Sequence, residues 1–383
     1  MDLTLTDDQE LIATTAHGFL EARCPMAHVR EMEADATGYS PGLWKEMAEL
    51  GWTGLAFPEE HGGAGGTFLD LCLVVEQMGR VQLPSPFLPT VVLCGTALAA
   101  HGTGDQRASR LGAIARGERI MSYARAAPGS GWDPSGSDVA ARRDGDGFVL
   151  DGTAMFVPYA HVADELVVVA QQAGGGPRDL TAFLVDGNAP GLSTRPLHTV
   201  HPGHEQRVEL DGVRVPAGDL LGDELGGAAV VATVAAHGAA ATCAEMVGGA
   251  QQVLGMTVQY ASEREQFDTP VGAFQAVQHH CANMGVDVLT SRLIAFEAIW
   301  RLSEGLDATE EVSMAKAWVS EAYRRVCALG HQVHGAIGFT REHDLHYFLR
   351  HAVATELAFG DGDHHWERVA RHLGLPERRG GAD

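Results

Sequence analysis

Basic residues are scarce in this chain of 383 residues. Lysine and arginine together number 27, against 50 aspartate and glutamate residues, and the formal net charge is −23. Nucleic acids and anionic membrane surfaces are bound mainly by clustered lysine and arginine. The composition therefore argues against a nucleic-acid or membrane partner. A phosphorylated small molecule needs only a local positive site and stays possible.

Cysteine is also sparse, and the N-terminal residues do not predict a targeting segment. The six cysteines are scattered, with no metal-ligand spacing, so we expect free thiols in apolar helices and no metal site. The N-terminal MDLTLTDDQE lacks the basic and apolar regions of a signal peptide. No uninterrupted apolar run reaches the ~18 residues of a membrane span. These absences predict a cytoplasmic protein.

The hydrophobic share of 45% and the charged share of 20% are typical of a globular chain, and this length predicts several packed units. Helical periodicity predicts an N-terminal helical domain over residues 1–118. Short alternating strands separated by Gly and Pro predict a β domain over 119–220. Long apolar helices predict a C-terminal four- to five-helix bundle over 221–375, followed by a frayed tail over 376–383. The fold class is mainly α with a central β domain.

Local signals place several helix starts. Thr6 is the expected N-cap of a first helix that opens with acidic residues, and Ser40 is the expected N-cap of a short helix. Asp307 with Glu310 resembles a capping box that starts the third bundle helix. In the β domain, GDGFVLDGTAMFVP predicts a hairpin.

The stretch ASEREQFDTPVGAFQAVQHHCANM, residues 261–284, joins two long predicted helices. Arg264 and Phe267 close the first helix, Pro270 breaks the chain, and Phe274 and Gln275 open the second. An arginine fork followed by a helix N-terminus suits an anion such as a pyrophosphate. An ordinary helix corner, with the arginine capping the preceding carbonyls, is the alternative.

Three motifs make the chain resemble the acyl-CoA dehydrogenase family along essentially its whole length. They are LWKEMAELGWTGLAFPEEHGG, REQFDTPVGAFQAVQH and QVHGAIGFT. The resemblance implies a three-domain fold with a β-barrel-like middle domain, an extended FAD cofactor and a tetramer. It also implies an acyl-CoA substrate, oxidised at its α,β-bond, and a flavoprotein electron acceptor.

The same resemblance implies which residues bind the ADP half of FAD, usually from a neighbouring subunit. The matching positions lie in the corner and in the turn after the third bundle helix: Arg264, Phe267, Gln275, Gln332, Val333 and Gly335. A cationic Arg264 suits a pyrophosphate, and glycine allows close backbone approach. For Gln332 and Gly335 a helix C-cap is the alternative. The nearby His331 and His334 are expected to make hydrogen bonds rather than to bind a metal.

The flavin half of the family's site is not matched. Ala126-Ala127-Pro128 stands where relatives usually have Thr-Glu-Pro, and Phe156-Val157-Pro158 replaces Trp-Ile-Thr. Ala154 stands where a lysine is common. Pro158 has neither a hydroxyl nor an N–H to offer a flavin.

The catalytic base is also missing, and the catalytic residue is unknown. Removing an α-proton needs a positioned carboxylate. Relatives supply a glutamate at the position of Phe359, or in a minority at the position of Gly238. Glu245, Glu356 and Asp361 are the nearby substitutes, and Asp361 is the best of them.

The leading hypothesis is a subunit of an acyl-CoA dehydrogenase that completes the FAD site of a homologous catalytic partner. The resemblance is to the subunit without the glutamate in heterotetrameric actinobacterial enzymes, some of which act on steroid side chains. The alternatives are a self-sufficient homotetramer with a displaced base, a flavin-dependent monooxygenase on the same fold, and an assembly protein without flavin.

Overall fold

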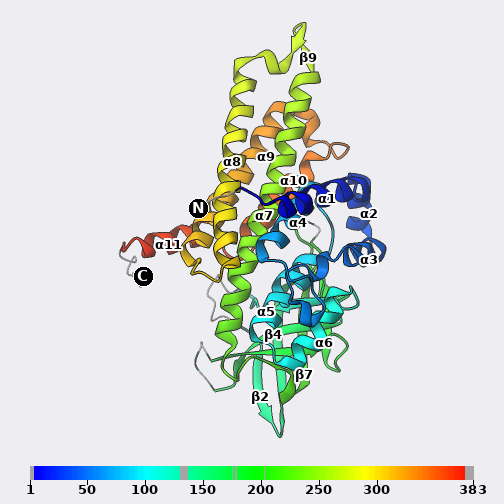
Figure 1. The fold of residues 1–383 in the computed structure, drawn as a ribbon, viewed down its shortest axis with the longest axis vertical. Helices are drawn as coiled ribbons and strands as arrows, with labels where there is room; N and C mark the ends of the chain where they lie inside the picture. The colour runs from blue at the N-terminus through cyan, green and yellow to red at the C-terminus, as the bar shows by residue number, and fades with distance from the viewer. Residues whose placement is uncertain (1–3, 130–136, 175, 177–178, 202, 376–383) are drawn as a thin grey trace. The chain divides into compact units, whose positions relative to one another are not determined.

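The computed structural model describes residues 4–129, 137–174, 176, 179–201 and 203–375. The predicted tail over 376–383 lies outside the described residues. The chain forms two compact units (Figure 1). We call residues 15–74 and 83–238 the sheet unit, and residues 1–14, 75–82 and 239–383 the bundle unit. The predicted order of helical, β and helical segments is confirmed. The domain boundaries at 118/119 and 220/221 stay predictions.

The first third of the chain is helical. Both expected caps are confirmed: Thr6 and Gln9 bond reciprocally at the start of α1, and the Ser40 hydroxyl accepts from Leu43 N at 3.2 Å. The Thr103 hydroxyl and Gln106 form a capping box on a later helix. The elements are α1 (Asp7–Arg23), α2 (Met26–Ala34), α3 (Pro41–Glu49), α4 (Phe68–Val81), the π-helical η3 (Leu88–Cys94), α5 (Gly95–His101) and α6 (Gly104–Ala115).

The sheet unit contains an eight-stranded mixed sheet. Its strands are β1 (Met121–Ala124), β2 (Ala140–Asp144), β3 (Gly147–Pro158), β4 (Glu165–Gln172), β5 (Leu180–Asp186), β6 (Leu192–Pro196), β7 (Glu205–Pro216) and β8 (Leu220–Leu221). The order is β6-β7-β3-β2-β4-β5-β8, and β1 pairs with β4 in parallel. The hairpin predicted within residues 145–158 is wrong, because Gly147–Pro158 forms one continuous strand; it pairs instead with the preceding β2, with Asp144 opposite Gly147. Two register shifts interrupt the β3–β7 pairing, one of them between Ala154 and Val157.

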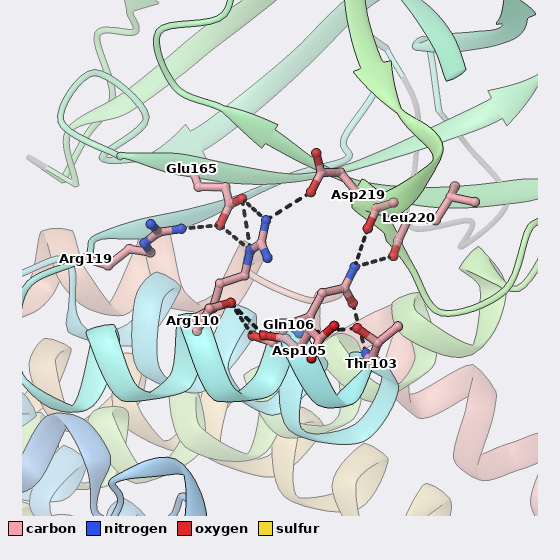
Figure 2. A network of polar contacts seen from close by, with 10 residues as sticks. Thr103, Asp105, Gln106, Arg110, Arg119, Glu165, Asp219 and Leu220 are labelled. Atoms are coloured by element: carbon pink, nitrogen blue, oxygen red, sulfur yellow. Dashed lines mark hydrogen bonds and ion pairs between the residues drawn. The ribbon is translucent and has the colours of Figure 1, made fainter. Parts of the chain in front are cut away.

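A polar network attaches α6 to the sheet (Figure 2). Glu165, at the start of β4, has a side chain only 8% exposed. It accepts two hydrogen bonds from Arg110 Nε, at 3.0 and 2.9 Å, and one from Arg119 at 3.0 Å. Arg110 also binds Asp219 at 3.1 Å, and Gln106 Nε2 donates to the Leu220 carbonyl at 2.8 Å. Because Glu165 is almost fully desolvated, the two arginines are needed to offset its burial.

The last third of the chain forms the helices α7 (Gly227–Glu263), α8 (Gln275–Ser303), α9 (Thr309–His334), α10 (Leu345–Leu357) and α11 (Gly362–His372). α9 packs against α8, α10 and α11. The expected capping box at Asp307 is wrong. Its carboxylate accepts from Thr309 N at 3.0 Å and Thr309 Oγ1 at 2.8 Å, so the helix begins at Thr309, without a side-chain cap. An aspartate that accepts from the residue two positions later forms an Asx turn, so the Asp307 carboxylate is bonded within the loop instead of capping the helix.

By length and composition alone, α7 is the one helix among the described residues that passes as a possible membrane span. Within the protein, 61% of its most apolar 18-residue window is buried. The core helix of a folded protein has this property, so the feature is weak evidence for a membrane.

In the bundle unit, α4 and α7 cross with their backbones in contact. A Cβ added to Gly248 would lie 1.8 Å from the Glu76 carbonyl oxygen, and one added to Gly79 would lie 2.0 Å from the Glu245 carbonyl oxygen. The Glu76 carboxylate beside this crossing accepts from Gln251 at 2.8 Å and from Arg292 Nε at 2.9 Å. The crossing therefore requires glycine on both helices, and it aligns the polar partners of a buried acid.

We expect Gly248→Ala to lower the free energy of unfolding by about 3 kcal/mol, because the new methyl group overlaps a backbone carbonyl that cannot move alone. Gly255→Ala on the same helix is the control, since open space surrounds that position. Alanine there should be neutral or stabilise by up to about 1 kcal/mol. Urea unfolding followed by circular dichroism measures both. Equal effects of the two substitutions would contradict the close crossing.

Glu165→Ala should lower the free energy of unfolding by about 3–5 kcal/mol, because it removes the carboxylate that Arg110 and Arg119 share and leaves Arg110 with Asp219 alone. Glu118→Ala removes an exposed acid paired with Arg116 and should leave the urea midpoint unchanged. The same unfolding assay compares the two variants. A small effect of Glu165→Ala would show that water replaces the network at no cost.

Candidate functional site

The corner between α7 and α8 is a small hairpin, which the sequence did not predict. The strands β9 (Glu265–Gln266) and β10 (Thr269–Pro270) pair antiparallel, and the connecting residues Phe267 and Asp268 have φ values of 59° and 61°. Two positive φ angles are typical of the tight type I′ turn, usually Asn-Gly. The hairpin lies at the end of α7 and α8 in the bundle unit (Figure 1). It holds Phe267 outward with 89% of its surface exposed.

The predicted binding residues of the corner point into solvent. Arg264 and Gln275 are exposed, and neither side chain has a hydrogen bond or ion pair within the described part of the chain. The ring of Phe274 lies edge-on to that of Phe267, with centroids 6.2 Å apart. The backbone of Arg264 closes the corner by accepting from Val271 N at 2.8 Å. The guanidinium is therefore not used as a helix cap and is available to an external anion.

The second predicted segment follows α9. Gln332 and Gly335 are exposed and Val333 is half-buried. The Gln332 side chain has no hydrogen bond to any residue that the structure describes. Gly335 has φ 64° and ψ −142° and no atom near the position of an added Cβ. A positive φ favours glycine at this C-cap position of α9, as the C-cap interpretation expects. Without a Cβ, Gly335 also leaves the surface open to close approach by a ligand.

A ring contact connects the two segments. Tyr260, one turn before Arg264, stacks on His334 with ring centroids 4.4 Å apart. Its hydroxyl approaches the His334 carbonyl oxygen at 3.4 Å. His334 in turn binds the Gly330 carbonyl oxygen at 2.7 Å, and His331 binds that of Cys327 at 2.8 Å. The expectation of hydrogen bonds at these two histidines is confirmed. The ends of α7 and α9 are thus fixed to each other.

The chemistry of this donor set fits the ADP half of a dinucleotide. An unpaired guanidinium can bind two phosphate oxygens at once. Two exposed amides add donors and acceptors, and Gly335 permits a backbone contact. All these residues belong to the bundle unit.

The segments expected at a flavin ring lie together in the sheet unit. Met155 N donates to the Ala126 carbonyl oxygen at 2.8 Å, which joins the Ala126–Pro128 segment to the bulge of β3. In that bulge Phe156 is 57% exposed with φ 55°, and Val157 is fully buried. The side chains of both triplets are apolar, so they offer no hydrogen bond to a flavin. The Ala126–Pro128 and Phe156–Pro158 segments therefore fit a flavin ring less well than the corner between α7 and α8 fits a pyrophosphate.

The two expected base positions carry no acid, and each of the three substitute carboxylates named from the sequence has a structural partner. Gly238 is buried in α7. Glu245 lies 3.4 Å from His351 Nε2. Glu356 accepts from Arg324 at 2.9 Å through both oxygens. Asp361 caps α11 by accepting from His364 N at 2.9 Å.

The loop that contains Phe359 is held by a buried lysine that the sequence analysis missed. Lys316 is fully buried, and its ammonium donates to the carbonyl oxygens of Glu356 at 2.9 Å and Gly360 at 3.0 Å. Burial lowers the pKa of Lys316 to about 8. Phe359 itself has φ 58°, and its carbonyl oxygen lies 3.0 Å from His365 Nε2. Lys316 therefore fixes the loop in which the family resemblance places one of the two expected base positions.

Comparisons with known proteins cover nearly the whole chain. Family models described as the N-terminal, middle and C-terminal domains of acyl-CoA dehydrogenase match residues 6–118, 122–212 and 226–374. The chain is 31% identical over 381 residues to the probable acyl-CoA dehydrogenase YngJ of Bacillus subtilis, covering 97% of this chain and 100% of that protein.

Solved structures agree. One chain of the ChsE4-ChsE5 complex from Mycobacterium tuberculosis superposes with a TM-score of 0.89 and 30% identity. The match covers 99% of the present chain and 100% of the chain in that complex. Butyryl-CoA dehydrogenase from Megasphaera elsdenii gives a TM-score of 0.91 with 26% identity, covering 97% and 100%.

The lowered pKa of Lys316 predicts a specific pH dependence. Between pH 8 and 10.5 the unfolded chain holds this proton and the folded chain does not, so the contribution of Lys316 to stability rises with pH. Relative to Lys316→Met, the wild type should gain about 1.4 kcal/mol per pH unit from pH 8 to 10, and nothing below pH 8. Urea unfolding at several pH values measures the difference.

Lys45→Met is the control for this measurement, because the Lys45 side chain is 77% exposed. Its stability profile should run parallel to that of the wild type. A parallel profile for Lys316→Met as well would mean that Lys316 keeps an ordinary pKa in the folded protein.

Proposed function

Because the chain belongs to the acyl-CoA dehydrogenase family of FAD-dependent oxidoreductases, we propose that it serves as the subunit that completes the cofactor site of a homologous catalytic partner. Its contribution is the binding of the ADP half of FAD through the corner and the turn after α9. The supporting observation is that Arg264 is exposed and has no partner among the described residues, while Glu245, Glu356 and Asp361, the three candidate substitutes for the base, each have one.

The proposed binding residues act by charge and shape. The Arg264 guanidinium would neutralise the pyrophosphate, and the amides of Gln275 and Gln332 would orient it. Phe267 would cover the site, because an aromatic ring that is 89% exposed gains by being buried against a ligand or a partner. Gly335 and Val333 would let the backbone approach closely. FAD, when bound in the catalytic chain, supplies the hydride acceptor for α,β-dehydrogenation of an acyl-CoA.

The pairing of the three candidate carboxylates supports the division between two chains. Abstraction of an α-proton requires an acid that is deprotonated and free to reach the substrate. Glu356 is held by Arg324, and Asp361 is held by the first turn of α11. Either could act as a base only after losing a bond that stabilises the loop. The proposed partner is a homologous chain that carries the base, and the ChsE4-ChsE5 complex is an example of a family member solved as a complex.

The binding half of the proposal is tested with the purified chain and with ADP, FAD and FMN as probes in isothermal titration calorimetry. We expect ADP and FAD to bind and FMN not to bind. Arg264→Ala should weaken ADP by about 10- to 100-fold, since a charge-assisted hydrogen bond is lost. Arg142→Ala, an exposed arginine on β2, is the matched control and should leave the affinity unchanged. Binding of FMN as strong as that of ADP would contradict the proposal.

The catalytic half is tested by the colour and reactivity of the chain purified alone. We expect no tightly bound flavin and no flavin reduction when butyryl-CoA is added. A yellow protein that butyryl-CoA reduces would instead establish a self-sufficient dehydrogenase. In that case loss of reduction in Asp361→Ala, with survival in Glu356→Ala, would identify the displaced base.

A further inference from the structure

The sheet unit contains an apolar cleft of ≈ 320 Å³ that none of the proposed FAD-binding residues lines. It lies between α4, α5 and the start of α7. Small side chains, including Ala56 and Ala99, leave the space open. Large apolar side chains, including Phe57, Phe68 and Leu71, form its walls. Ala100 at the rim is exposed, so the cleft opens to solvent. A cleft of this volume lies at the lower end of the range of about 300–1,000 Å³ found for small-molecule sites.

One polar atom in this cleft lacks a partner. The hydroxyl of Thr96 donates to the Val92 carbonyl oxygen, and that of Thr233 binds His101 Nε2 at 2.8 Å. His237 also lines the cleft, and its Nδ1 lies 2.9 Å from the Thr233 carbonyl oxygen. Its Nε2 has no hydrogen-bond partner within the described residues. The ring is fixed by the Phe68 ring, which lies edge-on with centroids 4.8 Å apart.

The protonation state of His237 follows from these contacts. A carbonyl oxygen can only accept, so Nδ1 carries the proton. Burial lowers the pKa of His237, which keeps the imidazole neutral at pH 7. In the neutral ring the other nitrogen is an acceptor. The cleft therefore presents one fixed acceptor, Nε2, on a half-buried ring beside apolar walls, and a hydroxyl can donate to it whereas a carbonyl cannot.

We propose that this cleft binds a compact apolar group that carries one hydrogen-bond donor, such as a hydroxylated alicyclic ring, with the donor bonded to His237 Nε2. The apolar walls supply most of the binding energy, and Nε2 selects a hydroxyl over a carbonyl at the same position. This inference does not depend on the role in the FAD site, because the cleft is built entirely from residues of the sheet unit.

The test compares cyclohexanol with cyclohexanone, which match in size but differ in having a donor. Ligand-detected NMR titration of the full chain measures both affinities. The wild type should bind the alcohol about 2- to 10-fold more tightly, the effect of one hydrogen bond. In His237→Phe, which keeps a ring but removes the acceptor, the two ligands should bind equally. In Ala99→Leu, which narrows the cleft, both should bind more weakly.

Two controls keep the result interpretable. His17→Phe, a histidine substitution on α1 at a side chain 43% exposed, should retain the preference for the alcohol. In wild-type protein with ¹⁵N-labelled histidine, cyclohexanol should shift the Nε2 resonance of His237 and cyclohexanone should not, which needs no variant to fold. Equal affinities in the wild type, an unshifted Nε2, or an affinity for the alcohol that Ala99→Leu leaves unchanged would each overturn the proposal. None of these readouts involves FAD or dehydrogenase activity.

Discussion

The close crossing of α4 and α7 is the constraint on which the bundle unit depends. Gly79 and Gly248 each face a carbonyl oxygen of the other helix, so the two backbones touch without side chains between them. At this spacing Glu76, with only 2% of its surface exposed, is placed between Gln251 of α7 and Arg292 of α8. A buried carboxylate needs both charge and hydrogen bonds, and the crossing brings these partners to it. The register of three helices is thereby set at one point.

Glu165 and Lys316, two other buried charged side chains, also depend on polar partners brought to them by the fold. Glu165 in the sheet unit is matched by Arg110 and Arg119. Lys316 in the bundle unit donates to two carbonyl oxygens and to the Ser320 hydroxyl, and none of these bonds is to an acid. Burial therefore makes Lys316 easier to deprotonate than an ordinary lysine. Its bonds to the carbonyl oxygens of Glu356 and Gly360 hold the loop on both sides of Phe359.

Local signals in the sequence predicted much of the fold. Thr6 and Ser40 cap helices because their hydroxyl groups face the first-turn amides, an interaction within three residues of the chain. Failures came where the partner is distant or the signal is atypical. Asp307 bonded two residues ahead rather than three. The hairpin at Phe267 and Asp268 uses left-handed residues without the usual Asn-Gly. Lys316 reaches carbonyl groups 40 and 44 residues away, which no periodicity reveals.

The exposed hairpin has a thermodynamic consequence beyond its own geometry. If one chain holds out Arg264 and Phe267 for a cofactor seated in another, then cofactor and neighbouring chain become ligands of one surface. Linkage is reciprocal, so each must raise the affinity for the other by the same factor. Dilution of the assembled protein then releases flavin, and removal of flavin loosens the assembly. In such a protein, the fraction of chains that carry flavin depends on the total protein concentration.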